Sequence, residues 1–140
     1  MADIFNVALH PREPVFMGNM VAALQADRIA GGPADLVLTE TGWTLFSIDL
    51  AADEAVFLDV GAETDLAAAP FSYLRQYETA RRLLRMKLAD FLHLPVHRDT
   101  GVPTAHLFNT GHCGSTLVHH ALNRSGQAWC LSEPLFTFDL

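Results

Sequence analysis

Apolar residues recur at intervals of three and four over residues 70–92, the spacing that places side chains on one face of a helix. Pro70 is favoured at a first helical position, and Pro95 follows the last apolar position. This pattern predicts one long helix. A similar pattern predicts a helix over residues 14–29, stopped by Gly-Gly-Pro at 31–33. The apolar face of the long helix consists of Phe71, Leu74, Tyr77, Ala80, Leu84, Leu88 and Phe91.

Three short apolar runs, residues 36–39, 44–49 and 55–60, predict strands between these two helices. The first two runs are separated by Glu-Thr-Gly-Trp at 40–43, which has the composition of a hairpin turn. The next connection, residues 50–54, is also of hairpin length. Together the three runs predict a small antiparallel meander.

The order of elements changes towards the end of the chain. Residues 104–109 predict a strand, residues 115–124 a helix that Gly126 ends, and residues 128–131 a second short strand. Strand, loop, helix and strand in this order open a parallel α/β sheet. We therefore expect an α/β fold: a partial P-loop-type parallel sheet, preceded by an α+β segment that holds the meander and the long helix.

A shift in composition over residues 93–103 predicts a boundary within the chain. This stretch reads as a loop, with a turn at Arg-Asp-Thr-Gly, residues 98–101. Residues 1–103 then form the N-terminal α+β segment, and residues 104–140 form the start of the α/β domain.

The loop before the predicted helix at 115–124 has the composition of an anion site. The first amides of a helix have no intrahelical acceptor, and the helix dipole adds partial positive charge there. Gly111 and Gly114 allow the backbone to wrap around a ligand, and Ser115 and Thr116 add hydroxyl donors. A phosphate or sulfate group is the expected guest.

Composition and charge restrict the partners. The chain has 140 residues, of which 50% are apolar and 18% charged, enough for a folded core. A net charge of -7 argues against nucleic acid and against a polybasic membrane surface. There is no secretory signal pattern and no apolar stretch of transmembrane length. With two cysteines, a reduced, cytoplasmic location is expected.

Two other chemistries of such loops fit less well. A Walker A motif requires a lysine before the hydroxyl residue, and residues 111–116 contain none. A cysteine phosphatase carries His-Cys, five residues and then arginine, with the thiolate at a helix N-terminus. His112 and Cys113 match its start, but His119 stands in place of the arginine that would grip the phosphoryl oxygens. The phosphatase stays open as a competing chemistry.

A metal site is not expected. The histidines and cysteines near the loop match no strong zinc spacing, and adjacent histidines on a helix point in different directions. The residues considered are His106, His112, Cys113, His119, His120 and Cys130.

The string Phe-Asn-Thr-Gly-His-Cys-Gly-Ser-Thr-Leu at 108–117, followed by Leu-Ser-Glu-Pro at 131–134, resembles the P-loop sulfotransferases, especially the bacterial sulfotransferase-like proteins. The resemblance implies that the loop binds the 5'-phosphosulfate of 3'-phosphoadenosine 5'-phosphosulfate and that sulfuryl passes to a hydroxyl or amine acceptor without a metal. The residues that would bind this co-substrate are Gly111, His112, Cys113, Gly114, Ser115 and Thr116.

The resemblance also implies two catalytic residues. His112 stands where the family has an arginine or lysine that neutralises charge on the bridging oxygen, so activity would depend on histidine protonation. Glu133 matches a glutamate proposed to take the proton of the acceptor.

In the family, an arginine and a serine on later elements hold the 3'-phosphate, and those elements would follow Leu140. We therefore expect a truncated, N-terminal fragment with little activity, prone to self-association through an open sheet edge. The alternative from another class is a non-catalytic anion- or nucleotide-binding remnant.

Overall fold

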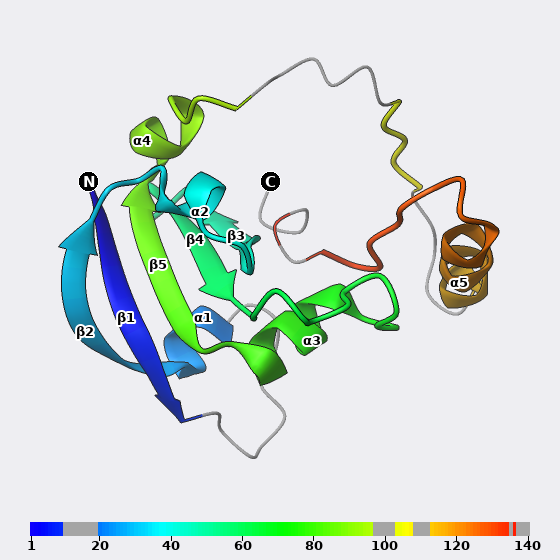
Figure 1. Ribbon diagram of the computed structural model, residues 1–140, viewed down its shortest axis with the longest axis horizontal. Helices are drawn as coiled ribbons and strands as arrows, with labels where there is room; N and C mark the ends of the chain where they lie inside the picture. Colours follow the sequence, from blue (N-terminus) through cyan, green and yellow to red (C-terminus); the bar gives the residue numbers. More distant parts are fainter. Residues whose placement is uncertain (10–19, 97–102, 108–112, 135, 137–140) are drawn as a thin grey trace.

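Five strands form one sheet in the order β2-β1-β5-β4-β3, and every neighbouring pair is antiparallel (Figure 1). The computed structural model describes residues 1–9, 20–96, 103–107, 113–134 and 136. The strands are β1 Ala2–Leu9, β2 Gln25–Gly32, β3 Trp43–Asp49, β4 Glu54–Asp59 and β5 Arg82–Lys87.

The expected α/β fold with a partial parallel sheet of P-loop type is therefore wrong. Residues 104–107, the described part of the strand predicted over 104–109, and residues 128–131, the second predicted strand, lie outside any strand. Leu107 and Trp129 are 68% and 71% exposed. An apolar run forms a strand only where a neighbour satisfies its backbone groups. The edge strands β2 and β3 pair with neither of these segments.

The long helix predicted over residues 70–92 is also wrong. The segment divides into α3 (Ser72–Thr79), β5 and α4 (Leu88–Leu92). Helix α3 ends at Ala80, whose φ of -57° and ψ of 128° turn the backbone into an extended conformation. The chain then enters the middle of the sheet as β5, between β1 and β4.

The central position of β5 in the sheet explains why the apolar spacing predicted a helix in its place. Leu83 and Leu84 are both buried, and they belong to two different clusters of core side chains. A strand buried on both faces reads as a nearly continuous apolar run, which periodicity alone does not separate from a helix. Leucine, arginine, methionine and lysine also favour helices locally, so pairing with two neighbouring strands overrides the local preference here.

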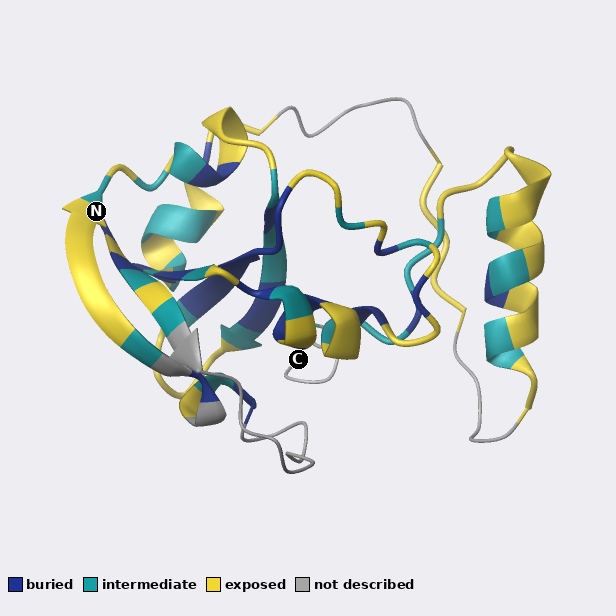
Figure 2. Ribbon diagram, turned by 60° about the horizontal axis from the view of Figure 1, so that its bottom comes forward, coloured by how far each residue is buried: buried dark blue, intermediate teal, exposed yellow. Residues whose placement is uncertain are grey.

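The core has two clusters of buried side chains, which β4 separates. Alternate residues of a strand point to opposite faces, and accordingly Val56 and Leu58 belong to one cluster and Phe57 to the other. Helices α1 (Met20–Ala23) and α3 contribute to the first cluster, and α2 (Leu36–Thr39) contributes to the second. Both faces of the sheet's centre are therefore covered, as the buried colouring in Figure 2 shows.

The remaining predictions for this half of the chain are confirmed in part. Strands β3 and β4 form the predicted hairpin, with a register irregularity between Leu45 and Ser47. The run at 36–39 forms the helix α2, so the first strand of the meander is wrong. In place of a continuous helix over 14–29, the described residues 20–29 form α1 and the first part of β2, and residues 14–19 lie outside the described ranges.

Helix α5 (Ser115–Ser125) confirms the helix predicted before Gly126, whose φ is 69° and whose amide bonds Asn123 O at 3.3 Å. The helix lies away from the sheet, at the opposite end of the molecule from β2 (Figures 1 and 2). The burial of its side chains is the reverse of what their polarity predicts, because the apolar Leu117 is 75% exposed while the polar His119 is buried. In the described part of the chain, no helix has the length and apolar character needed to cross a bilayer.

Candidate functional site

The N-terminus of α5 begins at a glycine in a left-handed conformation. Gly114 has a φ of 85°, a region that residues with a Cβ rarely adopt. Apart from its two chain neighbours, no atom of the described residues lies within 4 Å of the position that a Cβ would take there, and Gly114 is exposed. The backbone at this point therefore stands open to solvent and to any ligand that approaches it.

The first turn of α5 presents donors. Leu117 and Val118 donate their amides to Gly114 O at 3.0 and 3.2 Å. The amides of Ser115 and Thr116 belong to the first turn of the helix, which offers them no intrahelical carbonyl, and the described residues supply no other backbone acceptor for them. The first turn also contains no acidic side chain. These amides and the positive end of the helix dipole favour an anion.

The structure describes four of the six predicted loop residues. Cys113, Gly114, Ser115 and Thr116 lie together at the start of α5, and the Cys113 thiol is free and exposed. The predictions for Gly111 and His112 fall outside the described residues. The local order predicted from the sequence, a loop with glycine and two hydroxyl residues leading into a helix, therefore holds over residues 113–116.

Glu133 lies next to α3. Its φ of 48° is left-handed, which is uncommon for a residue other than glycine. Burial, followed by the negative charge of Glu133, raises the pKa of the Tyr73 hydroxyl above its ordinary value of 10.0. In the described structure no hydrogen bond or ion pair joins Glu133 to residues 113–116. The two predicted halves of the site are thus not brought into direct contact.

A polar clamp that the sequence analysis did not identify holds α5 in place. The clamp consists of Asn123, His119, Ala67 and Cys130. Asn123 Oδ1 accepts from Cys130 N at 2.8 Å. Asn123 Nδ2 donates to Ala67 O at 2.9 Å and to Cys130 O at 3.1 Å. One amide side chain thereby ties α5 to the following segment and to the loop before α3.

The clamp determines the tautomer of His119. Its Nε2 lies 3.1 Å from Cys130 O and 3.0 Å from Asn123 Nδ2. The two amide protons of Asn123 are already used on Ala67 O and Cys130 O. We therefore assign a proton to His119 Nε2, which donates to Cys130 O. His119 Nδ1 then carries a buried lone pair that has no hydrogen-bond partner among the described residues.

A second contact connects the same segment to α3. Ser72 donates its amide to Ser132 O at 2.8 Å and its hydroxyl to the same atom at 2.6 Å, and both residues are buried. Residues 130–132 therefore lie between the clamp on α5 and the start of α3. A polar pair one turn apart on a helix, such as His119 and Asn123, is the sequence signal that points to the clamp; no local signal points to Ser72.

No group of three or more histidine, cysteine, aspartate or glutamate side chains suited to a metal ion occurs in the part of the chain that the structure describes. Comparisons with protein-family models, with curated proteins and with solved structures find no match to this chain. The function of this chain must therefore be inferred from its own sequence and structure.

Proposed function

We propose that this chain is a sulfotransferase-family protein that binds the 5'-phosphosulfate of 3'-phosphoadenosine 5'-phosphosulfate at residues 111–116 and transfers sulfuryl to a hydroxyl or amine acceptor. One observation carries the proposal. A left-handed, open Gly114 leads into a helix whose first residues are Ser115 and Thr116, within a string that resembles the family's phosphosulfate loop.

The first turn of α5 suits the donor chemically. Two amides without a backbone acceptor among the described residues, two hydroxyls and the dipole of an 11-residue helix would favour an anionic sulfate or phosphate. The overall charge of -7 does not oppose this, because these partial charges act at short range. The N-terminal turn would stabilise the negative charge that develops on the leaving phosphate as the sulfuryl group is transferred.

In the proposed reaction, the acceptor oxygen or nitrogen forms a bond to sulfur while the bridging S–O bond breaks. The electron pair of that bond stays on the 5'-phosphate of the leaving 3'-phosphoadenosine 5'-phosphate. We assign His112 to the charge on the bridging oxygen and Glu133 to the acceptor proton. The assignment of Glu133 requires residues 130–134 to bring its carboxylate to the acceptor once the donor is bound.

The competing phosphatase chemistry has an observation against it. His119 takes the sequence position of the arginine that those enzymes need, and it is buried with its Nε2 on Cys130 O. A side chain held in this way is not available to a phosphoryl group at the N-terminus of α5. Cys113 and Cys130 are both free thiols, and we propose a reducing, cytoplasmic location.

Calorimetric titration with 3'-phosphoadenosine 5'-phosphate tests the loop. We expect binding by the wild-type chain and a loss of at least about tenfold in Gly114→Val, since a branched side chain is strained at this φ and would shift the backbone of the loop. Ser115→Ala, which leaves the backbone unchanged, should weaken binding by a smaller factor. Ser125→Ala, at the other end of α5, is the matched control and should bind like the wild type.

Absence of binding, or equal losses in Ser115→Ala and Ser125→Ala, would contradict the proposed loop. A transfer assay that follows labelled sulfate from the donor then separates the enzyme from the non-catalytic alternative. Binding without release of sulfate, to water or to a panel of alcohols and amines, would favour the binding module.

A further inference from the structure

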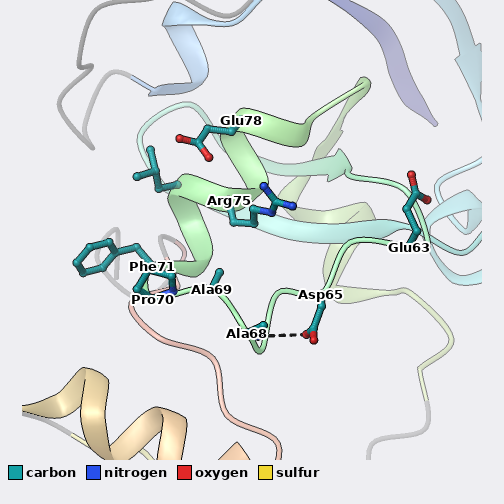
Figure 3. A pocket seen from close by; sticks show the side chains of 9 residues that line it. Glu63, Asp65, Ala68, Ala69, Pro70, Phe71, Arg75 and Glu78 are labelled. Atoms are coloured by element: carbon teal, nitrogen blue, oxygen red, sulfur yellow. Dashed lines mark hydrogen bonds between the residues drawn. The ribbon is translucent and has the colours of Figure 1, made fainter.

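A shallow groove of about 470 Å³ follows α3 and the loop before it (Figure 3). This volume lies within the range of small-molecule pockets. Its apolar lining comes from Ala68, Ala69, Pro70, Phe71 and Leu74. Phe71 and Leu74 are each 38% exposed, so apolar surface on α3 is open to a ligand.

The charges in the groove are predominantly negative. Glu63, Asp65 and Glu78 line it together with a single cation, Arg75, which lies between them in Figure 3. Glu63 is neutralised by its ion pair with Arg81, so the other two carboxylates and one guanidinium leave the lining with a net charge of -1. A ligand that complements this surface is positively charged.

The carboxylates differ in how far they are already engaged. Glu63 forms an ion pair with Arg81, outside the groove. Asp65 accepts from the amides of Ala67 and Ala68 at 3.0 and 3.1 Å. Neither Glu78 nor Arg75 forms an ion pair with any residue in the described ranges. Glu78 is therefore the carboxylate available to a bound cation.

We propose that this groove binds a small organic cation with an apolar body, a primary or quaternary amine that carries an aromatic or alkyl group. The ammonium lies by Glu78, and the apolar body covers Leu74 and the alanines. The exposed ring of Phe71, at one end of the groove in Figure 3, offers a face to a cation or an edge to an aromatic ligand. No residue of the anion-binding loop takes part, so this inference does not depend on the proposed sulfotransferase function.

Titration of the ¹⁵N-labelled chain with phenethylamine, followed by amide chemical shifts, tests the site. We expect the largest shifts at Ala68, Ala69 and Leu74. Glu78→Gln should weaken binding by about threefold, because a partly exposed charge pair is lost. Arg75→Gln should strengthen binding by about the same factor, because a repelling charge is removed. Opposite signs from two changes on one helix separate charge recognition from loss of structure.

Asp27→Asn, which removes an exposed carboxylate on β2, is the control for overall charge and should leave binding unchanged. The neutral isostere 2-phenylethanol should bind more weakly than phenethylamine. Three results would overturn the proposal: tighter binding of the anion phenylacetate, equal weakening by Asp27→Asn and Glu78→Gln, or no shift at the groove amides. Titration with 3'-phosphoadenosine 5'-phosphate reports on the other site, so a failure there leaves this test intact.

Discussion

Ser72 and Ser132, 60 residues apart in the sequence, are joined by two hydrogen bonds to one atom: Ser132 O accepts from the amide and from the hydroxyl of Ser72. The residue at the start of α3 thereby fixes the segment that follows α5. Because Asn123 binds Cys130 on the other side, residues 130–132 connect the antiparallel sheet domain to the helix with the candidate anion site.

Replacing Ser72 with alanine should destabilise the chain by about 1 kcal/mol, the net contribution of one buried hydrogen bond. The amide of residue 72 still satisfies Ser132 O, which limits the loss. Urea denaturation of Ser72→Ala and of Ser125→Ala, whose hydroxyl lies on the surface, measures the difference. A midpoint for Ser72→Ala equal to that of the wild type would show that the buried contact contributes nothing.

Replacing Asn123 with alanine should release α5. The change removes three hydrogen bonds and leaves the carbonyl of Ala67 without its described partner, a loss of about 2 kcal/mol. Hydrogen exchange of the α5 amides should then accelerate by a factor of about 30, while β4 and β5 stay protected. Arg124→Ala, one residue further on the exposed side, is the control. Unchanged exchange in α5 would contradict the clamp.

Glu40 should contribute to stability at neutral pH and lose that contribution in acid. Hydrogen bonding from Arg82, helped by Trp43, holds the pKa of the Glu40 carboxyl below its ordinary value of 4.5. A folded-state pKa below the unfolded one gives stability that is present above about pH 4.5 and disappears as pH falls through the folded value.

The difference in unfolding free energy between the wild type and Glu40→Gln should therefore be positive at neutral pH and vanish in acid. Denaturant titrations over this pH range measure it. Asp35→Asn, which removes an exposed carboxylate whose side chain caps no helix amide, is the control for the loss of one negative charge. A Glu40→Gln difference that is independent of pH would be the contrary result.

The two tyrosines should ionise above pH 10.0 in the native chain, because burial raises the pKa of each. The carboxylate of Glu133 adds to the effect on Tyr73. In a Tyr77→Phe background, Glu133→Gln should therefore lower the midpoint of the remaining tyrosinate absorbance. Since a raised tyrosine pKa gives stability that is lost as pH rises, the titration must be completed below the alkaline unfolding transition. An unshifted midpoint would place Glu133 away from α3.

Local signals led to correct predictions for elements whose bonds are themselves local. The β3–β4 hairpin closes over a short connection, residues 50–53, in which Asp53 has a φ of 56°. Helix α5 ends at Gly126, the residue type that adopts a left-handed C-terminal cap most readily. In both cases the sequence carries the turn residue that the backbone requires.

Elements that depend on distant partners could not be predicted in this way. Strand β5 has the spacing and propensity of a helix and becomes a strand because β1 and β4 pair with it on both sides. The apolar run at 104–107 has the composition of a strand and is not part of the sheet in the described structure. Only pairing across the chain distinguishes these two cases.

The candidate site likewise has one part that local sequence signals predict and one part that depends on distant contacts. The order of residues 113–116 at the start of a helix was predictable, because caps and glycines act within one turn. The position of Glu133 beside Tyr73 was not, because it follows from the long-range contact between Ser72 and Ser132. Residues that share a motif in the sequence need not share a surface in the fold.

The position of β5 has a consequence for how the chain is made. Among the described strands it comes last in the sequence, yet it occupies the middle of the sheet, between β1 and β4. The residues before it include both strands of the β1–β2 pair and both strands of the β3–β4 pair, and only β5 joins these two pairs. The six residues of β5, Arg82–Lys87, pair with β1 on one side and β4 on the other, so the five-stranded sheet can form only after β5 has been synthesised.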